Sequence, residues 1–311
     1  MKKRTNLFRD IIGLCKETFS AWVGINTPRL GASLAYYTVF AIAPLFLIVL
    51  RVAGIWFGQE AAQHELFGQV QQLLGKAGAT AIESMVTSAS NQASAGRWAT
   101  LIAIVTLGVG VTGVFVELQD ALNTVWQVKR ASGHGVRQFI KDRLLSFGVV
   151  IGIGFLLLVS LVLSAGLAGV GKYVQGLMPS EHFFWSTVNF VVSLGVITVL
   201  FSMIFKVLPD VKMAWRDVWV GGFITAVLFN LGKFVLGLYL GRSSVTSAYG
   251  AAGSLVIILM WVYYSAQILF FGAQFTRVYA NKYGSKMQPV AGAQLVDATA
   301  DRKLPARAAA H

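Results

Sequence analysis

The strongest candidates for a binding site in this sequence are positively charged residues within apolar stretches. Lys233 lies about seven residues before the end of an apolar stretch at 218–240, roughly 10 Å of helix from that end. Asn230 precedes Lys233 by one turn on the same face, and Arg51 lies near the end of another apolar stretch, 32–57. Because no Asp or Glu occupies this depth in any stretch, these cations can bind a lipid phosphate or another anionic group.

The same cations also allow a structural interpretation. The Arg51 side chain is long enough to extend to a membrane surface, and Lys233 can bond to helix-end carbonyl groups or line a small wet cavity. The structural role is favoured for Arg51, whereas both roles stay open for Lys233. Lys233, Asn230 and Arg51 together form the headgroup-binding hypothesis.

A pair of carboxylates lies at the expected inner end of an apolar stretch. Glu117 and Asp120 are one helical turn apart, at a depth where they would lie near Arg143 or Lys206. They predict either a structural ion-pair network or an inner gate, and the structural version is favoured because carboxylates beside basic loops are common.

Amide side chains and glycines within the apolar stretches indicate contacts between helices. Asn189, Gln267 and Gln274 can hydrogen-bond from one helix to another. Gly237 and Gly241 have the GxxxG spacing that allows two helices to approach closely.

The patterns that signal a catalytic centre or a cofactor are weak. The histidines form no HxxxH pair, and the single Cys15 excludes an internal disulfide and a cysteine-based metal site. Gly108, Gly110 and Gly113 spell GxGxxG, but the motif lies within an apolar stretch without a βαβ unit around it. We therefore expect no enzymatic activity, no metal and no other cofactor.

Composition indicates a membrane protein. Of the 311 residues, 56% are hydrophobic and 13% are charged, and the mean hydropathy is +0.65. The stretch Ala251 to Phe275 contains no Asp, Glu, Lys or Arg and is long enough to cross a hydrocarbon core of roughly 30 Å. We predict an all-α polytopic membrane protein with six transmembrane helices, at about 32–57, 98–116, 144–167, 183–205, 218–240 and 251–275.

The segments around this membrane domain (32–278) have patterns of their own. Residues 1–31 predict an amphipathic cytoplasmic arm whose helix lies in the membrane interface or packs on the protein's own loops. The outer loop 58–97 keeps a helical apolar stripe and predicts an amphipathic hairpin that breaks near Gly75 and Gly78. Residues 279–311, rich in Ala with scattered charge, predict a disordered cytoplasmic tail.

The distribution of positive charge predicts the orientation. Most of the 26 Lys and Arg residues fall in the N-terminal arm, in the loops after the second and fourth predicted spans, and in the tail. By the positive-inside rule these segments are cytoplasmic, and an even number of spans likewise puts both termini on one side. The net charge of +13 is thus explained by topology, and we expect no nucleic-acid partner.

Three segments resemble the YihY/BrkB family of bacterial inner-membrane proteins, some of which were formerly labelled ribonuclease BN. The segments are PRLGASLAYYTVFAIAPLF at Pro28 to Phe46, LPDVKMAWRDVWVGG at Leu208 to Gly222, and YGAAGSLVIILMWVYYSAQILFFGAQFTRVYA at Tyr249 to Ala280. The resemblance covers roughly residues 5–283. Relatives often carry Glu where this chain has Gln274, so a role that needs a charge there does not transfer.

The resemblance implies only a general function. Family members have carried ribonuclease and virulence-factor labels, some are linked to envelope lipid handling, and the family has no agreed catalytic motif. The ribonuclease label does not fit this chain, because metal-dependent phosphodiester chemistry needs clustered carboxylates or histidines. We expect a protein of the bacterial inner membrane that handles or translocates an amphiphilic anionic molecule, with anionic membrane lipids as partners. The alternative is a non-catalytic scaffold that forms homo-oligomers through Gly-rich faces.

Overall fold

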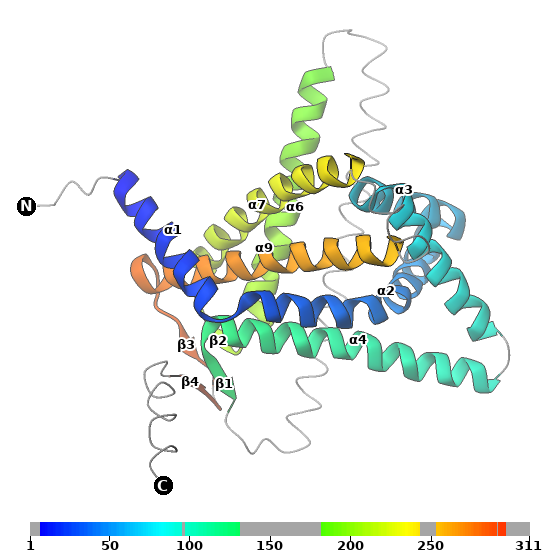
Figure 1. Cartoon of the computed structure of the whole chain (residues 1–311), viewed down its shortest axis with the longest axis horizontal. Coiled ribbons are helices and arrows are strands. Elements are labelled where there is room, and N and C mark those ends of the chain that lie inside the picture. The colour runs from blue at the N-terminus through cyan, green and yellow to red at the C-terminus, as the bar shows by residue number, and fades with distance from the viewer. Residues whose placement is uncertain (1–6, 95–96, 131–181, 243–252, 291, 297–311) are drawn as a thin grey trace, which may run out of the picture.

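Helices make up most of the structure, a computed structural model that describes residues 7–94, 97–130, 182–242, 253–290 and 292–296 (Figure 1). The helices are α1 (Leu7–Gly24), α2 (Thr27–Phe57), α3 (Gln59–Ser94), α4 (Arg97–Trp126), α6 (His182–Val207), α7 (Trp215–Arg242) and α9 (Gly253–Tyr283). The strands are β1 (Val128–Arg130), β2 (Val211–Lys212), β3 (Gln288–Pro289) and β4 (Ala293–Leu295).

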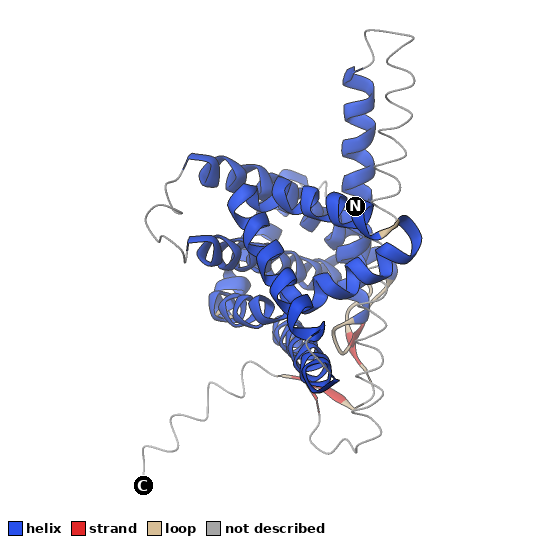
Figure 2. Ribbon diagram, turned by 90° about the vertical axis from the view of Figure 1, so that its right-hand side faces the viewer, coloured by secondary structure: helices blue, strands red, loops and turns tan. Residues whose placement is uncertain are grey.

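The long helices form a bundle with two different ends. α2, α4 and α9 run side by side, and α7 packs along α9 (Figure 1). α6 packs on α7 but is steeply inclined to the other helices, which Figure 2 shows from a second direction. One end, here called the strand end, holds α1 and the four strands, whereas the other, the hairpin end, holds α3.

Local sequence fixes the corner between α1 and α2. Asn26 adopts the left-handed conformation (φ 54°, ψ 43°), which Asn tolerates better than most residues. Pro28 follows in the first turn of α2, where a backbone N–H is not needed. α2 consequently begins at Thr27, before the predicted start of the span at residue 32, and continues through Pro44.

α3 is a helical hairpin that packs on the bundle by its apolar face. The chain leaves helical geometry at Gly75 (φ 74°, ψ 175°), a conformation that favours glycine, whereas Gly78 is helical. Val70 and Leu74 before the break and Ile82 after it are buried against residues of α2, α7 and α9. The stripe that predicted an amphipathic hairpin is therefore its packing surface.

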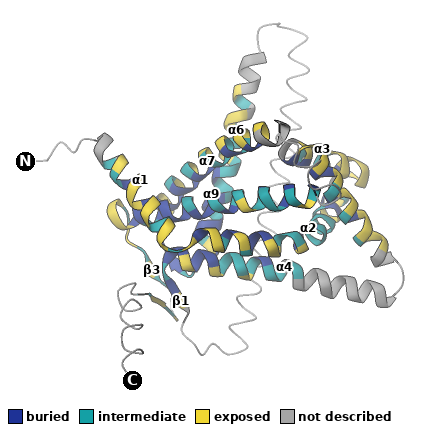
Figure 3. Ribbon diagram, in the orientation of Figure 1, coloured by how far each residue is buried: buried dark blue, intermediate teal, exposed yellow. Residues whose placement is uncertain are grey.

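The largest hydrophobic cluster lies toward the strand end, where the buried residues gather in Figure 3. The side chains of Trp126, Phe205 and Phe270 are fully buried there, and the rings of Trp126 and Phe205 lie 5.7 Å apart. This cluster joins α2, α4, α6, α7 and α9 into one core.

α7 and α9 approach closely where glycine on one helix meets threonine on the other. A Cβ atom on Gly272 would collide with Thr225, and a Cβ atom on Gly221 would collide with Thr276. Each threonine hydroxyl donates to a carbonyl of its own helix, Thr225 to Gly221 and Thr276 to Gly272, both at 2.7 Å. Gly237, which the GxxxG spacing suggested for helix contact, instead faces open space.

Four of the described helices are long and apolar enough to cross a membrane. The candidate segments are Thr27–Ile55, Phe190–Val207, Trp215–Leu238 and Gly253–Tyr283. The predicted span 98–116 falls within α4, which is not among these four, and the predicted span 144–167 lies outside the described residues. The structure thus shows a mostly helical membrane protein, and the count of six spans stays a prediction.

The expectation of a disordered tail from residue 279 is wrong for residues 279–290 and 292–296. α9 continues to Tyr283, after which β3 pairs with β2 and β4 pairs with β1, each antiparallel. The partners of β3 and β4 lie in the loops after α6 and α4, so the local composition of the tail could not reveal them. The predicted all-α class is therefore incomplete, because the described residues also form two small two-stranded sheets.

Candidate functional site

Lys233 lies in the half of α7 nearer the hairpin end, and its side chain is half-buried. In the part of the chain that the structure describes, its ammonium group has no hydrogen-bond or ion-pair partner. Asn230, one turn before it, is also half-buried and donates from Nδ2 to the carbonyl of Ala226 in its own helix at 2.9 Å. One face of α7 thus carries a free cation beside an amide whose oxygen is available to accept a hydrogen bond.

Arg51 lies on α2, also in the half nearer the hairpin end, and its side chain is exposed. Its neighbour Leu50 and the residue Leu236, one turn after Lys233, belong to the same hydrophobic cluster. Arg51 and Lys233 therefore border one apolar cluster from two helices, but no direct contact joins the two cations among the described residues.

Glu117 and Asp120 lie on α4 toward the strand end, half-buried and exposed respectively. Arg143, one of the basic residues expected near them, lies outside the described residues. Lys206, the other, donates to the carbonyl of Met213 and lies 5.6 Å from the centre of the Trp215 ring. The arrangement gives Lys206 a role in holding the loop before α7.

The predicted interhelical amides differ from one another in their contacts. Gln267 donates from Nε2 to the carbonyl of Thr27 at 3.3 Å and so joins α9 to the start of α2. Gln274 is completely buried, yet neither its Oε1 nor its Nε2 has a hydrogen-bond partner among the residues that the structure describes. Asn189 lies on α6, and its side chain is outside the described part of the structure.

A polar network at the strand end was missed by the sequence reasoning. Asn123 donates from Nδ2 to the Asp210 carboxylate at 2.8 Å and accepts from the Asp210 backbone N–H at 2.9 Å. Gln119 donates to the carbonyl of Leu208 at 3.0 Å. These bonds fix the LPDVK loop after α6 against the end of α4. Asn123 and Asp210 are 87 residues apart in the chain, so the sequence alone does not predict that they pair.

The same network continues to the end of α9. The buried carboxylate of Asp217, in the first turn of α7, accepts hydrogen bonds from the backbone N–H and the hydroxyl of Ser285 at 2.9 and 2.8 Å. Arg277 donates from Nη1 to the carbonyl of Val125 in the last turn of α4 at 2.8 Å. Arg277, near the end of α9, therefore caps a neighbouring helix.

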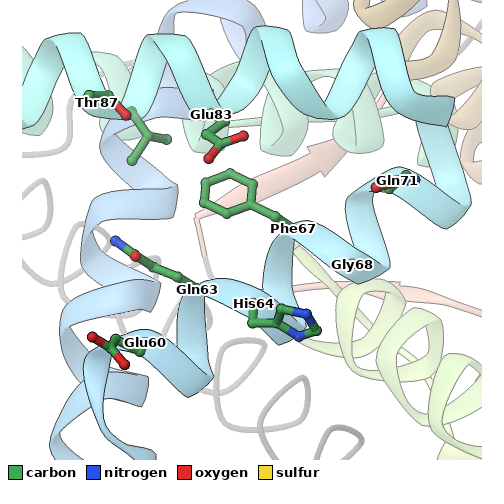
Figure 4. A pocket seen from close by; sticks show the side chains of 9 residues that line it. Glu60, Gln63, His64, Phe67, Gly68, Gln71, Glu83 and Thr87 are labelled. Carbon is green, nitrogen blue, oxygen red and sulfur yellow. The ribbon is translucent and has the colours of Figure 1, made fainter.

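A hollow of about 700 Å³ lies between the two halves of the α3 hairpin (Figure 4). The first half contributes Glu60, Gln63 and Phe67, and the second contributes Glu83 and Thr87. Phe67 and Glu83 point toward one another across the hollow in Figure 4. No part of the sequence reasoning assigned a site to this hairpin, because its polar residues are spread over both halves.

Across its described residues the structure brings no group of three His, Cys, Asp or Glu side chains close enough to hold a metal ion. The polar groups that it does assemble serve two different purposes. Those at the strand end are paired and hold loops in place, whereas Lys233 and the carboxylates of the α3 hollow are unpaired among the described residues.

Comparisons with known proteins place the chain in a family. A family model described as "Virulence factor BrkB" matches residues 18–294. A UPF0761 membrane protein of Pseudomonas paraeruginosa is 28% identical over 279 residues, which cover 86% of this chain and 62% of the relative. Similar proteins from Verminephrobacter eiseniae (29% over 256 residues, 79% and 57% covered) and Ralstonia nicotianae (28% over 252 residues, 80% and 54% covered) carry the same name.

The chain spans about three-fifths of the length of these curated relatives. No solved structure matches it. The helical bundle, its apolar membrane-crossing segments and the match over most of the sequence lead to one conclusion: this chain belongs to the BrkB family of membrane proteins.

Proposed function

We propose that this protein handles an anionic amphiphile, a membrane phospholipid, and moves it between the leaflets of the bacterial inner membrane. The observation that carries the proposal is the half-buried Lys233, whose ammonium group has no hydrogen-bond or ion-pair partner among the described residues. The proposal assigns no catalytic step to the chain.

The depth of Lys233 suits a lipid phosphate. The apolar segment of α7 ends at Leu238, so Lys233 lies about 8 Å short of that end along the helix axis. A cation at this depth is costly unless it pairs with an anion or with water. Because the described residues offer no carboxylate partner, a phosphate from the lipid is a chemically suitable partner.

The residues around Lys233 suit the acyl chains of the same lipid. Leu231, Phe234 and Val235 are 60%, 65% and 52% exposed, so this part of α7 presents apolar side chains outward. Asn230 lies one turn away, and its side-chain oxygen can accept a hydrogen bond from a headgroup hydroxyl. The headgroup and the acyl chains can thus contact different sides of the same segment of α7.

Reconstitution in vesicles tests the proposal directly. Vesicles of phosphatidylethanolamine and phosphatidylglycerol carry a fluorescent phosphatidylglycerol, and a membrane-impermeant quencher measures its exchange between leaflets. We expect the wild-type protein to accelerate the exchange and Lys233→Met to lower the accelerated rate by about tenfold or more, the size expected when one charge-assisted contact is lost.

Two control variants separate binding from folding. Lys233→Arg retains the positive charge and should keep most of the exchange rate. Lys212→Met removes an exposed cation from β2, at the strand end, and should leave the rate unchanged. Equal exchange in vesicles with and without the wild-type protein would overturn the proposal and favour the scaffold alternative.

A further inference from the structure

We propose that the hollow between the two halves of α3 binds a small organic cation, an amine with an apolar portion. The proposal goes beyond the lipid-handling function, because the hollow belongs to a different helix from Lys233 and has the opposite charge.

The hairpin carries a charge opposite to that of the whole chain. The net charge of the protein is +13, yet α3 contains Glu60, Glu65 and Glu83 against a single basic residue, Lys76. None of the residues that line the hollow is Lys or Arg, and His64 alone among them can become cationic. The hollow therefore attracts cations and repels anions.

Two exposed carboxylates line the hollow, one from each half of the hairpin. Glu60 comes from the first half of the hairpin and Glu83 from the second, and neither has a hydrogen-bond or ion-pair partner within the described ranges. These carboxylates do not form part of any metal-binding group among the described residues. A cation large enough to reach both walls can pair with both carboxylates.

The remaining lining suits the body of such a cation. Phe67 offers an aromatic ring, which attracts ammonium groups and packs with apolar carbon. The ring is held in place because it stacks on Phe46 of α2, with 6.1 Å between ring centres. Gln63 and Thr87 add hydrogen-bond acceptors for ammonium protons.

The size of the hollow is that of a ligand site. Its volume of about 700 Å³ lies within the range of roughly 300–1,000 Å³ that small-molecule sites occupy. Below it, Val70, Leu74 and Val86 are buried in the cluster that joins α3 to the bundle, so both walls have a firm support. The hollow is more polar than most small-molecule sites, which suits a charged ligand.

Titration calorimetry on the full-length protein in a neutral detergent tests the proposal with a matched pair of probes. Phenethylamine carries an ammonium group and an aromatic body, whereas 2-phenylethanol has nearly the same shape without the charge. We expect saturable binding of phenethylamine that is about tenfold or more tighter than that of 2-phenylethanol.

Variants of the hairpin locate the binding. The double substitution Glu60→Gln with Glu83→Gln should weaken phenethylamine binding about tenfold or more, since it removes both wall charges but keeps their shape. Glu65→Gln is the matched control, because Glu65 lies in the same hairpin, accepts from Gln69 at 3.4 Å and does not line the hollow. Both changes affect side chains outside the hydrophobic core, and thermal unfolding of each variant checks that it is folded.

Three results would overturn the proposal: no saturable binding of phenethylamine, equal binding of the uncharged probe, or an equal loss in Glu65→Gln. Lys233→Met should leave phenethylamine binding unchanged, so this test and the lipid-exchange test can fail separately. The source of the natural amine is then settled in nanodiscs. If the natural ligand is a lipid amine, phosphatidylethanolamine competes with phenethylamine, and the apparent binding of phenethylamine is weaker in phosphatidylethanolamine nanodiscs than in phosphatidylglycerol nanodiscs. Equal saturable binding of phenethylamine in both lipids identifies a soluble amine.

Discussion

At the scale of single residues, the buried amide of Gln274 is an exception to the rule that buried polar groups form hydrogen bonds. Its side chain is fully buried, and within the described ranges both of its polar atoms lack a hydrogen-bond partner. Buried polar groups are nearly always paired, because an unpaired one costs about 1–3 kcal/mol in lost hydration. The amide therefore lowers the stability of this protein unless water or a ligand binds it.

Replacement of Gln274 by Met should raise the stability of the protein. Met has nearly the same volume as Gln and no amide, so the unfavourable desolvation of about 1–3 kcal/mol is removed without a cavity. Thermal unfolding in detergent measures the change as a higher Tm. The matched control is Gln267→Met on the same helix, which should raise the Tm less, because it also removes the hydrogen bond from Nε2 to Thr27. A lower Tm for Gln274→Met would show instead that the amide has a bound partner.

The sequence identifies such residues but not their contacts. Polar residues at membrane depth are visible as interruptions of apolar stretches, and this is why Lys233, Gln267 and Gln274 could all be selected. Whether each one is paired depends on the neighbouring helix, which contributes a carbonyl to Gln267 and nothing to Gln274. That difference arises from helix positions and not from the residue type.

At the scale of elements, the crossing of α7 and α9 shows how small residues bring two helices together. Gly221 and Gly272 each lie against a threonine of the facing helix, with no room for a Cβ atom. Because lipid tails are as apolar as leucine, close packing of this kind provides much of the attraction between membrane helices. The crossing also positions α7, and with it Lys233.

A methyl group at the crossing should therefore destabilise the bundle. Gly272→Ala introduces a Cβ atom that collides with Thr225, a buried residue, and we expect a loss of about 1–3 kcal/mol in the free energy of unfolding. Gly237→Ala is the control on α7, because its Cβ atom would meet open space and alanine is the better helix former. Denaturant unfolding compares the two variants, and equal stability would show that the crossing is not tightly packed.

Helices were much easier to predict from this sequence than strands. Apolar runs and helical spacing indicate where α2, α7 and α9 lie, because these signals are contained in the runs themselves. β3 and β4 are two and three residues long and exist only because they pair with loops far away in the chain. The GxxxG spacing at Gly237 predicted a helix contact, but none of the described residues lies near this glycine, since the spacing cannot say which face of α7 meets α9.

At the scale of the whole molecule, positive charge gathers at one end of the bundle. Described basic residues of α1, of the loops beside the strands and of the end of α9 belong to the strand end: Lys16, Lys129, Lys206, Lys212, Arg216, Arg277, Lys282 and Lys286. The hairpin end holds the acidic hairpin α3. By the positive-inside rule, we expect the strand end in the cytoplasm and the α3 hairpin on the outer side.

The single cysteine allows this orientation to be tested with little change to the protein. Cys15 is exposed on α1, at the strand end, so a membrane-impermeant maleimide should label it in permeabilised cells but not in intact spheroplasts. In a Cys15→Ser background, Gln71→Cys places a thiol on the exposed surface of the hairpin and should be labelled in intact spheroplasts. Lys286→Cys, beyond α9, should behave like Cys15. If Cys15 and Gln71→Cys were labelled from the same side, the bundle could not cross the membrane along α2, α7 and α9, and the position of Lys233 in the lipid would be lost with it.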